Sequence, residues 1–126
     1  MNHIFNDDPL AVAQLIREKI AELDEERPRL FDTAQSKAQA ISDYDRAMAI
    51  TILKLKNETI TSFAGELVGK VAVTLIPLIA KGICYKECFT KEAEESCYKA
   101  VISNIEAIKA GLNGLQSVNK HLDNLK

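Results

Sequence analysis

The stretch "FAGELVGKVAVTLIP", residues 63–77, decides the fold because it lies between two long runs of helical apolar spacing. It is close to a phosphate-binding loop, in which four residues separate two glycines and Lys plus Ser or Thr follow, so that backbone N–H groups surround a phosphate. Here three residues separate Gly65 from Gly69, and a valine follows Lys70. We therefore interpret the stretch as a tight connector, which the sequence allows to be a loop, a β-hairpin with "VAV" as a strand, or a short helix.

A long helix is predicted on the N-terminal side of the connector. Asp8 is suited to cap its first N–H groups, and Pro9 suits the first helical position because it lacks an N–H that would have no partner there. Pro28 predicts a kink or a break near Glu25, because proline removes a backbone hydrogen bond and clashes with the preceding turn. We favour the kink, because the apolar stripe stays in phase across the proline, although it passes through Arg27. The stripe contains Ile16, Ile20, Leu23, Leu30, Ala34, Ala38, Ile41, Tyr44, Met48, Ile52 and Leu55.

A second long helix is predicted after the connector. Pro77 fits its first turn if Thr74 is the cap, because N–H groups there have no partner within the helix to lose. The two patterns predict a helix over about 9–56, a connector over about 57–73 and a helix over about 74–124. The second stripe contains Leu75, Leu78, Ile79, Ile83, Phe89, Ala93, Cys97, Val101, Ile105, Ile108, Leu112, Leu115, Leu122 and Leu125.

These elements predict an all-α fold in a single domain over residues 1–126, a long antiparallel two-helix hairpin with a short glycine-containing connector. Two helices cannot cover each other's apolar stripes completely. We therefore expect self-association into a helical bundle of four or more helices, with a homodimer as the smallest form. Further apolar side chains lie off the main seam and add to the surface to be covered: Ile50, Leu53, Val12, Ile102 and Val118.

Composition narrows the classes of partner and compartment. The 126 residues have a formal net charge of −2, so net charge does not favour non-specific nucleic-acid binding. The most apolar stretch, 71–80, has half of the roughly 20 residues that a membrane span needs, so we expect no membrane partner. The first ten residues lack the pattern of a secretory signal, and three cysteines suit a reducing compartment. We expect a cytoplasmic protein.

The residues that usually carry chemistry form no recognisable constellation. Cys84 and Cys88 are four apart, whereas Cys97 would lie about 20 Å from Cys84 along a helix, so we expect no metal site and no cofactor. The only histidines, His3 and His121, leave little for nucleophilic catalysis. We therefore predict that the protein is not an enzyme.

The candidate ligand-binding residues are cationic and aromatic side chains that flank the connector. A group of this kind at the end of a helical bundle suits a phosphate or an anionic nucleotide, with a helix N-terminus contributing. Solvated lysines without a ligand are the structural alternative. The candidates are Lys54, Lys56, Lys70, Lys81, Tyr85 and Lys86, and a second possible anion contact beside Pro28 is formed by Arg27 and Arg29.

Three stretches resemble small uncharacterised proteins that phages and prophages of Gram-positive bacteria encode, often near genes for single-strand-annealing recombination. They are "DYDRAMAITILKLKN" (43–57), "LIAKGICYKE" (78–87) and "AVISNIEAIKAGLNGLQSVNKHLDNLK" (100–126). The resemblance covers about the C-terminal two-thirds of the chain, whereas the connector differs. It implies a phage origin and action in the cytoplasm of the host, and it carries no catalytic motif.

These observations lead to two hypotheses. The first is a non-enzymatic, phage-encoded oligomeric binding protein that acts in counter-defence, by sequestering a host signalling nucleotide between subunits or by blocking a host defence protein. The alternative is an accessory factor in phage DNA recombination or replication, which binds an annealing protein or single-stranded DNA. Seven aromatic residues and no Trp count against the DNA form of this alternative.

Overall fold

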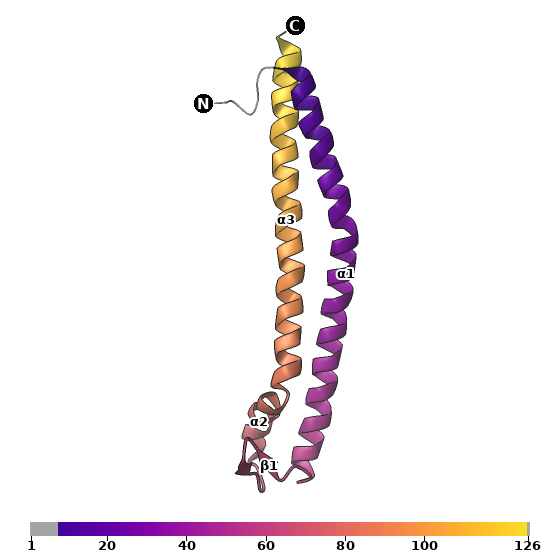
Figure 1. The fold of residues 1–126 in the computed structure, drawn as a ribbon. Coiled ribbons are helices and arrows are strands. Elements are labelled where there is room, and N and C mark those ends of the chain that lie inside the picture. Colours follow the sequence, from indigo (N-terminus) through magenta and orange to yellow (C-terminus); the bar gives the residue numbers. More distant parts are fainter. Residues whose placement is uncertain (1–7, 126) are drawn as a thin grey trace. The chain divides into compact units, whose positions relative to one another are not determined.

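The structure, a computed structural model, describes residues 8–125. The all-α fold class predicted from the sequence is confirmed (Figure 1). No helix in this part of the chain combines the length and the apolar composition needed to cross a membrane. In chain order the elements are α1 (Pro9–Lys56), β1 (Ser62–Phe63), β2 (Glu66–Leu67), the 3₁₀ helix η1 (Val73–Leu75), α2 (Ile76–Ile83) and α3 (Tyr85–Asn124).

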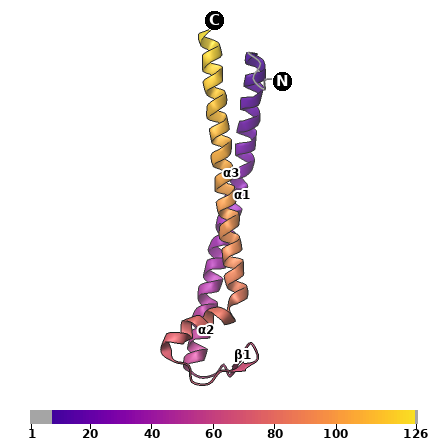
Figure 2. The same ribbon diagram turned by 90° about the vertical axis from the view of Figure 1, so that its left-hand side faces the viewer.

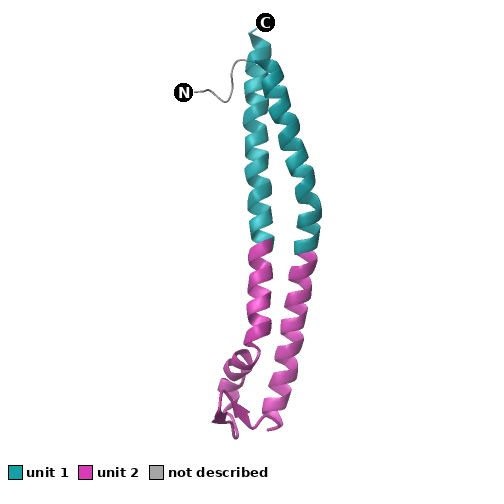
Figure 3. Ribbon diagram, viewed as in Figure 1, with its two compact units in different colours: residues 1–33, 98–126 teal, residues 34–97 magenta. Residues whose placement is uncertain are grey.

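The chain forms two compact units, and α1 and α3 each contribute one segment to both (Figure 3). Among the described residues, unit 1 comprises 8–33 and 98–125, and unit 2 comprises 34–97. The two helix segments within each unit run antiparallel, because rising residue numbers on α1 meet falling numbers on α3. In unit 2, for example, Lys91 Nζ lies 4.6 Å from the centre of the Tyr44 ring, and Thr51 Oγ1 lies 3.3 Å from Cys84 Sγ.

The start of α1 agrees with the sequence prediction. The backbone N–H of Leu10 donates to Asp8 Oδ1 at 3.0 Å, so the predicted cap is confirmed, with Pro9 at the first helical position. The helix continues through Pro28 without interruption. The alternative prediction, a break of the helix near Pro28, is therefore wrong.

The end of α1 is closed by backbone hydrogen bonds that the sequence did not indicate. Glu58 adopts a left-handed conformation with φ of 57°. Its N–H donates to the carbonyl of Leu55 at 3.2 Å, and the N–H of Thr59 donates to the carbonyl of Lys54 at 2.9 Å. These two bonds form a Schellman motif, which satisfies carbonyls that would otherwise have no partner at the helix end.

The connector contains a β-hairpin, one of the three forms that the sequence allowed. Ser62 pairs with Leu67 and Phe63 pairs with Glu66. The turn between them places Ala64 at φ of 51° and Gly65 at φ of 81°, the two left-handed positions of a tight hairpin turn. The expectation that "VAV" would be the strand is wrong, because its last valine begins η1. Gly65 therefore provides a left-handed position in the hairpin turn.

The second helix is not one continuous element, which corrects the prediction of a helix over 74–124. It is divided at Cys84, whose ψ of 27° departs from helical geometry. The cap prediction is also wrong, since α2 starts after Leu75 without a side-chain cap and Thr74 lies in η1. The division lets α2 pack its buried side chains, Ile76 and Ala80, against Leu55 of α1. Figure 2 shows the chain leaving α1 through the connector and returning through α2.

The packing face of α1 in unit 1 lies to one side of the predicted apolar stripe. Val12 and Glu26 are buried, whereas Ile20, Arg27 and Phe31 are exposed. An apolar stripe on a helix spans 100° or more, and one neighbouring helix covers only part of it. The prediction that Val12 lies off the seam is therefore wrong.

The other side chains expected off the seam are only partly covered. Ile50 and Leu53 are exposed, which confirms this part of the prediction, and Ile102 and Val118 are half-buried. Apolar surface beyond the seam is thus present on α1 in unit 2.

Gly82 gives a test of the connector packing. A β-carbon at this position would lie 2.7 Å from Phe63 Cζ, closer than real side chains come. We expect Gly82→Ala to lower the free energy of unfolding by about 1 kcal/mol, because overpacking at about 1–3 kcal/mol exceeds the gain of up to about 1 kcal/mol in helix propensity. Urea denaturation measures the change.

The matched control is Gly114→Ala on α3, where an added β-carbon meets open space. This substitution should stabilise the protein by up to about 1 kcal/mol. In a Phe63→Leu background the cost of Gly82→Ala should disappear. Equal effects of the two alanines in the wild-type background would contradict the packing of Phe63 on Gly82.

Candidate functional site

The predicted cationic group lies entirely in unit 2, at the ends of its helices and in the connector. Lys54 and Lys56 occupy the last turn of α1, and Lys81 occupies the last turn of α2. Cations stabilise a helix C-terminus, where unpaired carbonyls leave partial negative charge. The positions of these three lysines therefore have a structural explanation that needs no ligand.

The remaining members of the group are exposed, and none of the grooves described in residues 8–125 joins them to these lysines. Lys70 lies in the connector, and Tyr85 and Lys86 begin α3, with Lys86 Nζ 6.0 Å from the centre of the Tyr85 ring. Lys86 lines a shallow groove of about 170 Å³ together with Asp43 and Glu87. The two carboxylates weaken the attraction of this groove for an anion. The structure thus places the group at one end of unit 2 without forming a phosphate cradle.

Arg27 and Arg29 each lie beside a carboxylate one turn earlier on α1. Arg27 Nε is 3.8 Å from Asp24 Oδ1, and Arg29 Nη1 is 3.4 Å from Glu26 Oε1. Both guanidinium groups are largely exposed, where such pairs contribute little to stability. An anion at this place would compete with the carboxylates, so the predicted second anion contact gains no support from the geometry.

The three cysteines are free thiols in different environments. Cys84 is buried and pairs with Thr51, Cys88 is half-buried, and Cys97 is exposed. Within residues 8–125, no three His, Cys, Asp or Glu side chains are grouped so that they could hold a metal ion. His121 is exposed in the last turn of α3, and His3 lies outside the described residues.

Thiol reactivity tests the burial of Cys84 at the junction of α2 and α3. We expect Cys97 to react first with Ellman's reagent and Cys84 at least about tenfold more slowly, because a buried thiol reacts only during local opening. The double substitution Cys88→Ser with Cys97→Ser isolates the rate of Cys84. Equal native rates for Cys84 and Cys97 would contradict a closed junction, whereas in denaturant the rates should converge.

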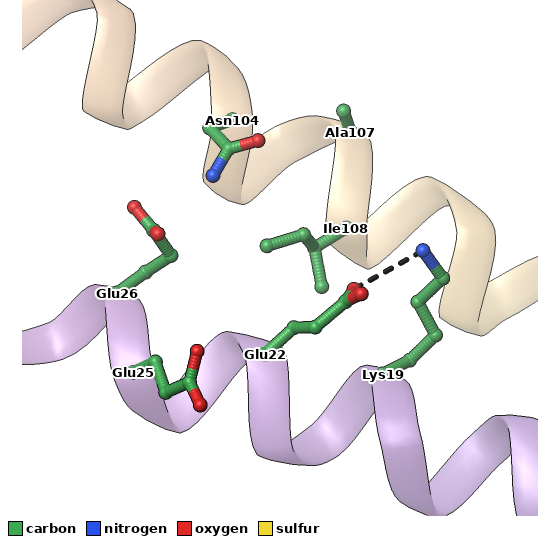
Figure 4. A pocket seen from close by; sticks show the side chains of 7 residues that line it. All are labelled: Lys19, Glu22, Glu25, Glu26, Asn104, Ala107 and Ile108. Carbon is green, nitrogen blue, oxygen red and sulfur yellow. Dashed lines mark hydrogen bonds and ion pairs between the residues drawn. The ribbon is translucent and has the colours of Figure 1, made fainter.

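A groove of about 370 Å³ in unit 1 was missed by the sequence analysis. The residues that line it on α1 and α3 are Lys19, Glu22, Glu25, Glu26, Asn104, Ala107 and Ile108 (Figure 4). The sequence signal was present, because Val12, Lys19 and Glu26 are spaced seven apart and so share one face of α1. The predicted apolar stripe passes through Arg27 and not through Glu26.

Glu26 is the unusual member of this groove. The residue is only 6% exposed, and its Oε2 atom is buried with no hydrogen-bond partner, the one such side-chain atom among the described residues. Leaving a buried polar group without a partner costs roughly 1–3 kcal/mol, and more for a charged group. Glu26 Oε2 can therefore accept a hydrogen bond that no described residue donates.

Unit 2 also presents large apolar side chains to solvent. Tyr85 and Phe89 lie one turn apart on α3 and are 62% and 73% exposed, while Leu78 on α2 is 68% exposed. Leu53 on α1 is 60% exposed, whereas Thr51 and Leu55, two positions away on either side in sequence, are buried. We call the four residues Leu53, Leu78, Tyr85 and Phe89 the outer apolar set.

Comparisons of the chain with protein-family models, with curated proteins and with solved structures found no match.

Proposed function

We propose that this protein is a non-enzymatic binding protein that acts as an assembly of two or more copies of itself. The observation that carries the proposal is the outer apolar set of unit 2, whose four side chains are at least 60% exposed. Contiguous apolar surface marks sites of association, and within this set Tyr85 and Phe89 are neighbours one turn apart on α3. Self-association would cover this set by pairing it with the same set on a second copy, as a two-fold dimer does.

We propose that the assembly acts in counter-defence by binding a protein of the infected host. The resemblance to phage-encoded proteins is the reason for proposing this role. The geometry supports a protein partner over a trapped nucleotide, because large apolar side chains anchor protein interfaces, whereas the lysines near them are exposed and share no described cavity.

Self-association is tested by sedimentation velocity at micromolar concentration. We expect the wild type to sediment as a dimer or larger species, and Leu53→Glu or Phe89→Glu to weaken the association at least about tenfold, because each would place an unpaired charge in the interface. Asn113→Glu, at an exposed polar site in unit 1, adds the same charge and should have no effect. A wild type that sediments as a single chain would contradict the proposal.

A second candidate function, single-stranded nucleic-acid binding, is favoured by one observation. Tyr85 and Phe89 are exposed aromatic side chains one turn apart, and Lys81 and Lys86 lie beside them in sequence. Proteins that bind single strands stack bases on exposed aromatic rings and contact the phosphates with cations. This arrangement agrees with the accessory role in recombination.

Fluorescence anisotropy with a labelled single-stranded oligonucleotide tests this candidate. If it is correct, Tyr85→Ala and Phe89→Ala should each weaken binding about fivefold or more, since stacking contributes about 1–3 kcal/mol per base. Phe31→Ala, an exposed aromatic side chain in unit 1, serves as the control and should leave binding unchanged. No binding at low salt, or an equal loss with the control, would exclude this function.

A further inference from the structure

The groove of unit 1 has a surplus of negative charge. Glu22, Glu25 and Glu26 line it, and Lys19 Nζ is 3.1 Å from Glu22 Oε2, so the one lysine of the groove neutralises one carboxylate. Figure 4 shows Lys19 and Glu22 paired at one end, and Glu26 and Asn104 extending toward each other from α1 and α3 at the other. The second end therefore combines the carboxylates of Glu25 and Glu26 with one amide, and Arg29 forms an ion pair with Glu26 from outside the groove.

An acidic groove alone does not indicate a ligand, but Glu26 adds an independent observation. Its Oε1 accepts a hydrogen bond from Arg29 at 3.4 Å, whereas its Oε2 is buried and has no partner. A buried carboxylate oxygen without a donor is satisfied by a group that brings its own N–H or O–H. The groove thus lacks a donor at one defined atom.

We propose that this groove binds an ammonium or guanidinium group through Glu26 Oε2. Asn104 adds an amide from α3 that carries both an N–H donor and an oxygen acceptor, and its nitrogen lies on the Glu26 side in Figure 4. The Glu25 carboxylate supplies a second negative charge at the same end of the groove. A bare metal ion fits less well, because the described residues contain no group of three acidic or other ligating side chains at metal-binding range. An organic cation needs fewer charged partners, since its N–H groups donate directionally to single acceptors.

Two sources offer the same chemistry. One is a free small amine such as putrescine or agmatine, for which a volume of about 370 Å³ is sufficient. The other is a Lys or Arg side chain of a second copy of this chain. The site lies in unit 1, so it does not depend on the outer apolar set of unit 2.

The first arm of the test uses free amines. Thermal unfolding is followed with putrescine, agmatine and tetramethylammonium at constant ionic strength. We expect the first two to raise the Tm and tetramethylammonium, which carries charge without N–H donors, to leave it unchanged. Glu26→Gln should weaken amine binding at least tenfold, whereas Glu18→Gln, an exposed carboxylate of α1 outside the groove, should retain it.

The second arm measures association without added amine. If the cation comes from a second copy, Glu26→Gln should change the sedimentation of the protein and Glu18→Gln should not. Without ligand, Glu26→Gln should melt at the same or a higher temperature than the wild type, since the unpaired carboxylate is removed, so a loss of binding is distinguishable from misfolding. If neither the Tm with amines nor the sedimentation depends on Glu26, the groove is not a cation site.

The two arms also separate this inference from the proposed function. Leu53→Glu and Phe89→Glu test assembly through unit 2 and leave the groove residues unchanged. A protein that assembles but shows no response at Glu26 would refute only the cation site. A protein that binds amines through Glu26 but sediments as a single chain would refute only the assembly.

Discussion

The packing of one helix against one other helix is the constraint from which the rest of this structure follows. In unit 1 the segments of α1 and α3 bury a single narrow seam, with Val12 on one side and Ile108, Leu115 and Leu122 on the other. A helix face covered by one neighbour remains open on both flanks. Ile20 consequently stays exposed although it belongs to the apolar stripe, and Phe31 beside the stripe is exposed as well.

Unit 2 relieves this constraint locally by adding short elements beside the helix pair. The division at Cys84 lets α2 contact the end of α1, and the cluster of Leu55, Ile76 and Ala80 is joined by half-buried side chains from the connector. The Thr51–Cys84 contact fixes the junction from the α1 side. The four residues of the outer apolar set stay exposed beside this cluster.

The same constraint explains why a carboxylate lies in the seam of unit 1. Glu26 occupies a packing position by its spacing from Val12, and its aliphatic part contributes to burial while one oxygen is left without a donor. A group that pairs with this oxygen binds the folded chain and not the unfolded one, so binding and stability are thermodynamically linked. In this way the unpaired oxygen that destabilises the folded chain is also the atom through which we propose that a cation binds.

Local interactions determined what the sequence predicted correctly. The Asp8 cap, the extent of α1 and the all-α class depend on neighbours within one or two turns, which is the range over which residue types and spacing carry information. The grouping of the lysines near the connector was equally visible, but it was not visible that only Lys86 lines a described groove, beside Asp43 and Glu87. Only the tertiary structure decided which flank of α1 is buried, that Glu26 rather than Arg27 enters the seam, and that the second helix divides at Cys84. These outcomes depend on contacts between residues far apart in the chain, such as the 33 positions that separate Thr51 from Cys84, and the periodicity of a single helix does not encode them.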